Sequence, residues 1–174
     1  GRMLAHLDAS GLADNTLVVV YSDHGMEFFE HDTWGQGNSA IGEASQRIPL
    51  VIRDPRQPGT GRIDNVVRSI DLVPTLLDLA GLPGVASLEG VSLAPCLGPD
   101  ADACPELDAF NETGIWIAHI PGLPETHLRY PDLLELMEVP NRESGTLAIK
   151  PEYRELTLTA KDRMIRHAQW KLVY

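Results

Sequence analysis

One short run of residues most constrains what this chain can fold into. Residues 16–21, Thr-Leu-Val-Val-Val-Tyr, are rich in β-branched side chains and almost continuously apolar. Such a run predicts a strand covered on both faces, as in a parallel sheet, rather than a strand with one face in water. It stops abruptly at residues 22–25, Ser-Asp-His-Gly. We therefore expect an α/β sheet in which a buried strand delivers polar side chains at its carboxyl end.

Other segments of the first half fit the same α/β class. Apolar spacing predicts a helix at 2–10 and strands at 48–52 and 63–67. The clearest helix is 71–80, with Asp71 as its N-cap and Gly81 as its stop. We expect its core-facing stripe to consist of Val73, Leu76, Leu77 and Ala80.

The second half of the chain has a different character. Pro and Gly are scattered through 83–131, with one convincing strand at about 109–117. A helix is expected at 131–137. Residues 163–166 and 170–174 have the pattern of an antiparallel hairpin. We therefore divide the chain into two parts, 1–108 and 109–174.

Composition excludes some partners. The chain has 174 residues and a formal net charge of −11, which repels nucleic-acid backbones, so we expect no nucleic-acid partner. No apolar run approaches the roughly 20 residues that a membrane span needs. The sequence leaves the oligomeric state open.

The two cysteines, Cys96 and Cys104, are too few for a disulfide scaffold. Because the residues between them have the composition of a surface loop, we expect two free thiols, with a bridge across the loop as the alternative. Sparse cysteine and acidic charge together favour the cytoplasm. The chain begins inside a helical pattern and ends inside an expected strand, and we expect it to be part of a longer protein.

Asp23 and His24 are the strongest candidates for chemistry. A carboxylate oxygen and an imidazole nitrogen at one strand end suit one divalent metal ion, with Zn, Mn or Ca as candidates. The alternative is that Asp23 caps the next turn and His24 satisfies a local hydrogen bond. Glu27, Glu30 and Glu43 follow in a polar stretch, where we expect surface or structural residues, although each could orient a histidine or water.

Several segments, in order, resemble the sulfatase family of the alkaline phosphatase superfamily. The resemblance is carried by these residues: Asp14-Asn15-Thr16-Leu17-Val18-Val19-Val20-Tyr21-Ser22-Asp23-His24-Gly25, Phe28-Phe29-Glu30-His31, Trp34-Gly35, Gly37-Asn38-Ser39, Glu43 to Ile52, and Ser69 to Gly81. The terminal hairpin is similar to the family's small C-terminal antiparallel sheet.

The resemblance implies a fold class and a domain assignment. The fold would be an alkaline-phosphatase-like α/β sandwich, with a mixed, largely parallel sheet between helices, incomplete here. Residues 1–108 would be the C-terminal part of that α/β domain, and 109–174 its remainder with the start of the small antiparallel subdomain.

The resemblance also implies hydrolysis of a sulfate ester through a covalent intermediate on a metal-activated nucleophile. Asp23 and His24 would be two ligands of one divalent metal ion (Ca, Mn or Zn). His31 would contact a small anionic ester substrate, with ordering of its loop as the alternative role.

The family's nucleophile lies in a Cys/Ser-x-Pro-x-Arg motif, where Cys or Ser becomes formylglycine. None of the 13 prolines here has Cys, Ser or Thr two positions before it. The sequence therefore contains no catalytic nucleophile of this type, and we expect the 174 residues alone to be inactive while a longer parent is the enzyme.

Two alternatives remain at this point. A phosphodiesterase or phosphonate monoester hydrolase of the same superfamily would share the metal site. A non-catalytic relative could instead use the same crevice to bind a ligand or partner, which the absent nucleophile motif favours and the intact Asp23-His24 pair opposes.

Overall fold

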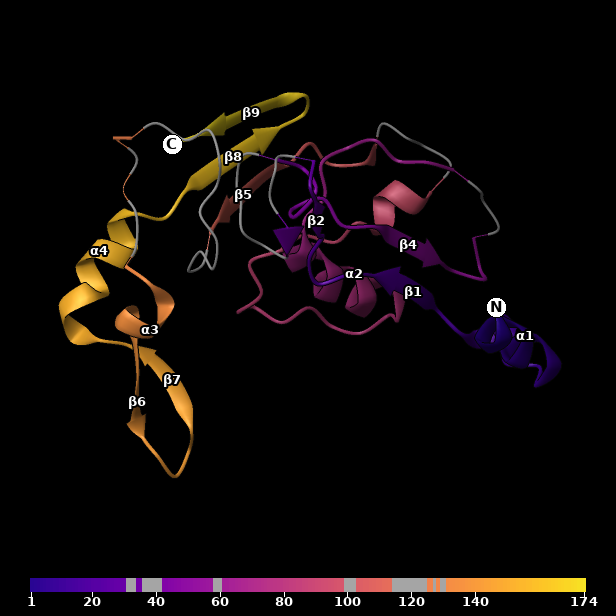
Figure 1. The fold of residues 1–174 in the computed structure, drawn as a ribbon. Helices are drawn as coiled ribbons and strands as arrows, with labels where there is room; N and C mark the ends of the chain where they lie inside the picture. The colour runs from indigo at the N-terminus through magenta and orange to yellow at the C-terminus, as the bar shows by residue number, and fades with distance from the viewer. Residues whose placement is uncertain are drawn as a thin grey trace. The chain divides into compact units, whose positions relative to one another are not determined.

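The computed structural model describes residues 1–30, 34–35, 42–57, 61–98, 103–113, 125–126, 128 and 131–174 (Figure 1). The chain forms two compact units. The first consists of Gly1–Asp23, Ile48–Ala109 and Arg166–Lys171, and the second of His24–Arg47, Phe110–Ile165 and Leu172–Tyr174.

The helices and strands are short. The α-helices are α1 (Arg2–Ala9), α2 (Leu72–Leu79), α3 (Leu133–Leu136) and α4 (Arg154–Thr159). The strands are β1 (Val18–Tyr21), β2 (Glu27–Phe28), β3 (Trp34–Gly35), β4 (Leu50–Arg53), β5 (Asp108–Glu112), β6 (Met137–Asn141), β7 (Thr146–Ile149), β8 (Arg163–His167) and β9 (Trp170–Val173). Within the described ranges, no helix combines the length and apolar character needed to cross a membrane.

The strands predicted at 16–21 and 48–52 are present as β1 and β4. They pair with each other in antiparallel register, with Val20 opposite Val51. A strand of a parallel sheet with both faces covered was expected. In the described part of the chain β1 instead pairs with an antiparallel strand, and both valines are more than half exposed. The expected strand at 63–67 is wrong, because residues 61–68 contain no strand.

Helix α2 confirms the helix predicted at 71–80. Its end is closed by Gly81, which has a φ of +68° and whose N–H donates to the carbonyl of Asp78 at 2.9 Å. The predicted core stripe is wrong at Val73 and Ala80, which are exposed, whereas Leu76 and Leu77 are half-buried. Val73 is 49% exposed, and the buried residues of the helix are Thr75 and Leu79.

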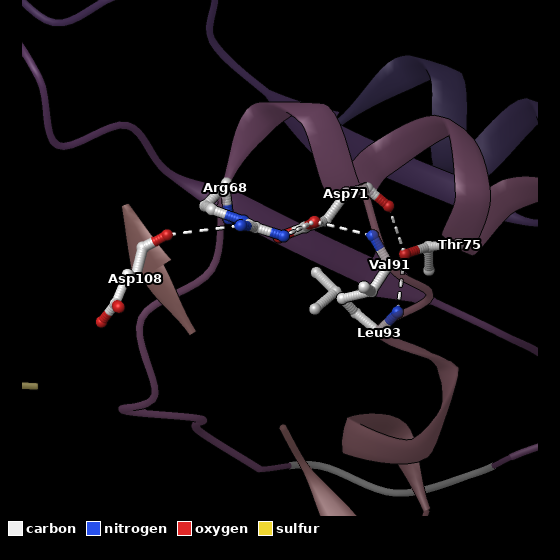
Figure 2. A network of polar contacts seen from close by, with 6 residues as sticks. All are labelled: Arg68, Asp71, Thr75, Val91, Leu93 and Asp108. Carbon is white, nitrogen blue, oxygen red and sulfur yellow. Dashed lines mark hydrogen bonds and ion pairs between the residues drawn. The ribbon is translucent and has the colours of Figure 1, made fainter. Parts of the chain in front are cut away.

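A polar network explains why a threonine is buried in α2 (Figure 2). The Thr75 hydroxyl donates to the Asp71 carbonyl at 2.6 Å and accepts from the Leu93 N–H at 2.8 Å. The Asp71 carboxylate accepts from the Arg68 guanidinium at 2.8 Å and from the Val91 N–H at 3.0 Å. The polar groups in this network satisfy one another's hydrogen bonds. Val91 and Leu93 are therefore held against the start of α2 by polar contacts.

A small apolar cluster lies beside this network. Leu93 packs with Cys96 and Cys104, and Leu50, Val67 and Leu107 pack against them. The two cysteines form a disulfide with a Cα–Cα separation of 4.2 Å. The expectation of free surface thiols is therefore wrong: both residues are buried next to Leu93, although the loop that joins them has a surface composition.

The later part of the chain contains one predicted hairpin and one unpredicted hairpin. Strands β8 and β9 confirm the predicted pair, closed by reciprocal backbone hydrogen bonds between Arg163 and Tyr174, and they join β5 in a three-stranded sheet. The helix expected at 131–137 is α3, capped by the Asp132 carboxylate through the Leu134 N–H. The β6–β7 hairpin and helix α4 were not predicted.

Candidate functional site

Strand β1 brings the polar residues of the motif to its carboxyl end, as the sequence predicts. The strand ends at Tyr21, and Asp23 follows as an exposed residue in a bend. The carboxylate is therefore held at a strand end, the usual place for ligand-binding residues in α/β folds. It belongs to the first compact unit.

His24 is the first residue of the second unit and is partly buried. Its Nδ1 lies 2.7 Å from the carbonyl oxygen of Gly25. Because a carbonyl can only accept a hydrogen bond, Nδ1 carries the proton in this contact. In the neutral imidazole the lone pair is then on Nε2, which is the protonation pattern of a metal-binding histidine whose other nitrogen donates to a backbone carbonyl.

Gly25 is fixed by the loop that contains Ala44 and Ser45. Its N–H donates to the Ser45 carbonyl at 2.9 Å. A Cβ atom at position 25 would lie 1.8 Å from the Ala44 carbonyl oxygen, far inside van der Waals contact. Glycine is therefore required here by the close approach of two backbone segments.

Glu27 lies in an environment that the sequence did not reveal. It begins β2 and is fully buried, not on the surface. The Ser45 hydroxyl donates to its Oε1 at 3.2 Å, and its Oε2 is buried with no hydrogen-bond partner among the described residues. The sequence signal for a role of Glu27 was its position three residues after His24. Its burial was not predicted, because the surrounding residues are polar.

The rest of the predicted site is only partly visible. His31, predicted to contact substrate, lies outside the described residues. Among the residues that are described, no group of three or more His, Cys, Asp or Glu side chains could hold a metal ion. Asp23 and His24 are only two ligating residues, so the described part of the chain does not contain a full coordination shell.

The first unit also contains a hollow of about 390 Å³. It is lined by Asp14, Asn15, Thr16, Leu17, Pro55, Arg56, Leu79 and Ala80. None of the predicted site residues lines it. Its Arg56 guanidinium is already engaged by the Asp54 carboxylate at 2.7 Å, which holds the pKa of Asp54 below its usual value.

Comparison with known proteins gives these residues a context. Residues 1–82 match the family profile described as Sulfatase. The chain is 37% identical to arylsulfatase K of Canis lupus familiaris over 95 residues, which is 55% of this chain and 17% of the dog protein.

Two solved structures are similar to the whole chain. The phosphonate monoester hydrolase of Silicibacter pomeroyi matches with a TM-score of 0.68 and 28% identity, over 99% of this chain and 29% of that one. The structure of BT4656 in complex with its substrate D-glucosamine-2-N,6-O-disulfate matches with a TM-score of 0.62 and 25% identity, over 100% of this chain and 28% of that one.

The chain thus spans less than a third of the length of each of these proteins. These neighbours confirm the predicted alkaline-phosphatase-like α/β fold class. The largely parallel sheet expected with it is not seen in the described pairings β1–β4, β2–β3 and β6–β7, which are antiparallel. Residues 1–82 are thus similar to the sulfatase family, and the whole chain is similar in fold to a phosphonate monoester hydrolase and to BT4656.

Proposed function

We propose that the protein containing this chain hydrolyses sulfate esters, and that Asp23 and His24 are two ligands of one divalent metal ion. The observation that carries the proposal is the position of Asp23 and His24 directly after the carboxyl end of β1. The His24 Nδ1–H bond to the Gly25 carbonyl supports it, because this tautomer has its lone pair on Nε2. The match of residues 1–82 to the Sulfatase profile suggests the reaction class.

The donor set fits a divalent ion. An ionised carboxylate and a neutral imidazole suit Zn or Mn, and Ca would fit if further oxygens joined them. Such an ion would act as a Lewis acid toward the charge on the ester group. Of the chain's own residues, Asp23 contributes a negative charge, His24 contributes a fixed nitrogen, and we propose that His31 donates a hydrogen bond to a substrate oxygen.

The nucleophile must come from residues outside this sequence, because no Cys/Ser-x-Pro-x-Arg motif occurs in it. We propose that the chain is one part of a longer hydrolase, in which that nucleophile is formylglycine, and that the 174 residues alone have no turnover. The small share of each relative that the chain covers supports this proposal.

A phosphonate monoester hydrolase is the second candidate, favoured by the structural match to the Silicibacter enzyme over 99% of this chain. Rates on an aryl sulfate, an aryl phosphonate monoester and an aryl phosphate diester, measured with one preparation, would separate the two activities. A preparation that binds metal and hydrolyses none of the three would instead indicate a non-catalytic relative. A small anionic ester, such as a sulfated sugar, is the proposed substrate class.

The test of the metal assignment uses the protein that contains this chain, with Asp23→Ala and His24→Ala variants. We expect both variants to lose bound metal, measured by elemental analysis, and to lose ester hydrolysis. Asp64→Ala is the matched control, since Asp64 is an exposed carboxylate paired with Arg62. Unchanged metal content and unchanged hydrolysis in Asp23→Ala would contradict the assignment.

A further inference from the structure

We propose that Glu27 and Ser45 are positioning residues for His24 and act on it through Gly25. The inference rests on the proposed metal-binding role of His24. All of these residues lie in the second compact unit, within His24–Arg47. None of the features that predict the metal ligands assigns a role to Glu27 or Ser45.

Glu27 is a buried carboxylate. The residue is 0% exposed, and one of its carboxylate oxygens has no hydrogen-bond partner in the described part of the chain. Burying a polar group without full hydrogen bonding costs free energy, on the order of 1–3 kcal/mol for a single missing bond. A glutamate at such a position needs a reason beyond stability, because an apolar side chain would avoid that cost.

Ser45 contacts both Glu27 and Gly25, with different atoms. Its hydroxyl donates to Glu27 Oε1 at 3.2 Å, and its carbonyl accepts from the Gly25 N–H at 2.9 Å. Ser45 is itself only 4% exposed, so it has little freedom to move. The buried carboxylate therefore fixes the residue that holds the Gly25 backbone.

A hydrogen bond connects Gly25 to the His24 imidazole. The Gly25 carbonyl is the acceptor for His24 Nδ1, and the same residue packs so closely on Ala44 that it cannot carry a Cβ. A shift of the loop at Ser45 would therefore turn the Gly25 carbonyl and with it the imidazole ring. Groups that orient a metal-binding histidine in this indirect way commonly change metal affinity about 10- to 100-fold when they are removed.

The experiment measures metal affinity directly. The apo form of the protein that contains this chain is titrated calorimetrically with Zn²⁺, Mn²⁺ and Ca²⁺ in separate runs. We expect Ser45→Ala and Glu27→Ala to weaken binding about 10-fold or more. Ser45→Thr retains the hydroxyl and Glu27→Gln retains an acceptor for it, so we expect both to stay within about 3-fold of the unsubstituted protein.

A second readout does not require metal. Nitrogen chemical shifts of His24 report which ring nitrogen carries the proton, and we expect the Nδ1–H form in the unsubstituted apo protein and a mixture in Ser45→Ala. Ser92→Ala is the matched control, because the Ser92 hydroxyl also donates to a carboxylate, that of Asp78, but in the first unit. Thermal unfolding identifies any variant that fails to fold. If Glu27→Ala fails to fold, Ser45→Ala, which removes a single oxygen, still tests the proposal.

The outcomes separate the two proposals. If the unsubstituted protein binds metal and Ser45→Ala binds it equally well with an unchanged His24 tautomer, the positioning role is overturned and the metal site stands. If the unsubstituted protein binds none of the three ions, both proposals are overturned. An equal loss of affinity in Ser45→Ala and Ser92→Ala would also overturn the positioning role, because it would reflect general destabilisation.

Discussion

The Asp71 carboxylate accepts a hydrogen bond at 3.0 Å from the backbone N–H of Val91, a residue 20 positions later in the chain. The same carboxylate accepts from the backbone and from the guanidinium of Arg68, and it is fully buried (Figure 2). Arg68 also donates to the carbonyl of Asp108, at the start of β5. Asp71 therefore links the start of α2 to Val91, and Arg68, its ion-pair partner, links it to Asp108.

Replacing this carboxylate should destabilise the protein strongly. We expect Asp71→Asn to lower the free energy of unfolding by about 3 kcal/mol, because it removes one partner of a buried ion pair and leaves Arg68 uncompensated. Urea denaturation measures the change. Asp64→Asn breaks an ion pair whose side chains are both 76% exposed, and we expect it to cost less than about 1 kcal/mol. Equal losses in the two variants would contradict the role given to Asp71.

The same carboxylate predicts a dependence of stability on pH. Burial alone raises the pKa of Asp71, but the hydrogen bonds from Arg68 and Val91 outweigh it and hold the pKa below the ordinary 3.8. Folding favours the ionised form of Asp71, so the stabilisation that it contributes is complete above the pKa of the unfolded state. This stabilisation is lost as the pH falls through the lower pKa of the folded state.

We therefore expect the stability difference between the unsubstituted protein and Asp71→Asn to be constant above about pH 5 and to shrink as the pH falls below about 4. Urea midpoints measured across this range check the prediction. Asp54, whose pKa is lowered by its hydrogen bond from Arg56, is present in both proteins and cancels in the difference. A difference that grows toward low pH would have the wrong sign.

Gly25 offers a test of the loop contact that is independent of any side chain. We expect Gly25→Ala to displace the loop at Ala44, since the added Cβ would lie 1.8 Å from a backbone oxygen, and to weaken metal binding and lower the unfolding midpoint. Gly84→Ala is the control, because nothing lies within 4 Å of its Cβ position, and it should change stability by no more than about 1 kcal/mol. Metal binding that survives Gly25→Ala at full strength would argue against the close contact.

The disulfide should contribute measurably to stability. We expect a Cys96→Ser/Cys104→Ser double variant to lose about 2–4 kcal/mol of unfolding free energy, mainly because the unfolded chain gains freedom. The native protein should take up no alkylating agent without a reductant, which intact mass measures. Two alkyl groups on unreduced native protein would show that the cysteines are not joined.

The sequence predicted the elements whose signals are local. The apolar run at 16–21 and the helix that ends before Gly81 can be recognised from neighbouring residues alone. Both are present in the structure, as β1 and α2. The prediction of which face of α2 is buried was wrong at Thr75. The buried Thr75 hydroxyl accepts a hydrogen bond from the Leu93 N–H, 18 residues away, and apolar spacing within the helix does not reveal that partner. The β6–β7 hairpin was missed because its turn, closed by Gly145 at a φ of +63°, lies in a polar stretch.

The candidate site was predictable only where a motif carries it. Asp23 and His24 lie at the end of β1 as expected, whereas the burial of Glu27 depends on Ser45, 18 positions later. The preference for the cytoplasm stays a prediction.

The disulfide has a further consequence for how the chain responds to proteases. Cys96 and Cys104 enclose residues 97–103 in a covalent ring. A protease that cuts one peptide bond within this ring leaves both products joined through sulfur, so the nicked protein keeps its mass apart from one added water. Its two pieces would separate on a denaturing gel only after reduction, and a cut at this position would escape detection on any gel run without a thiol.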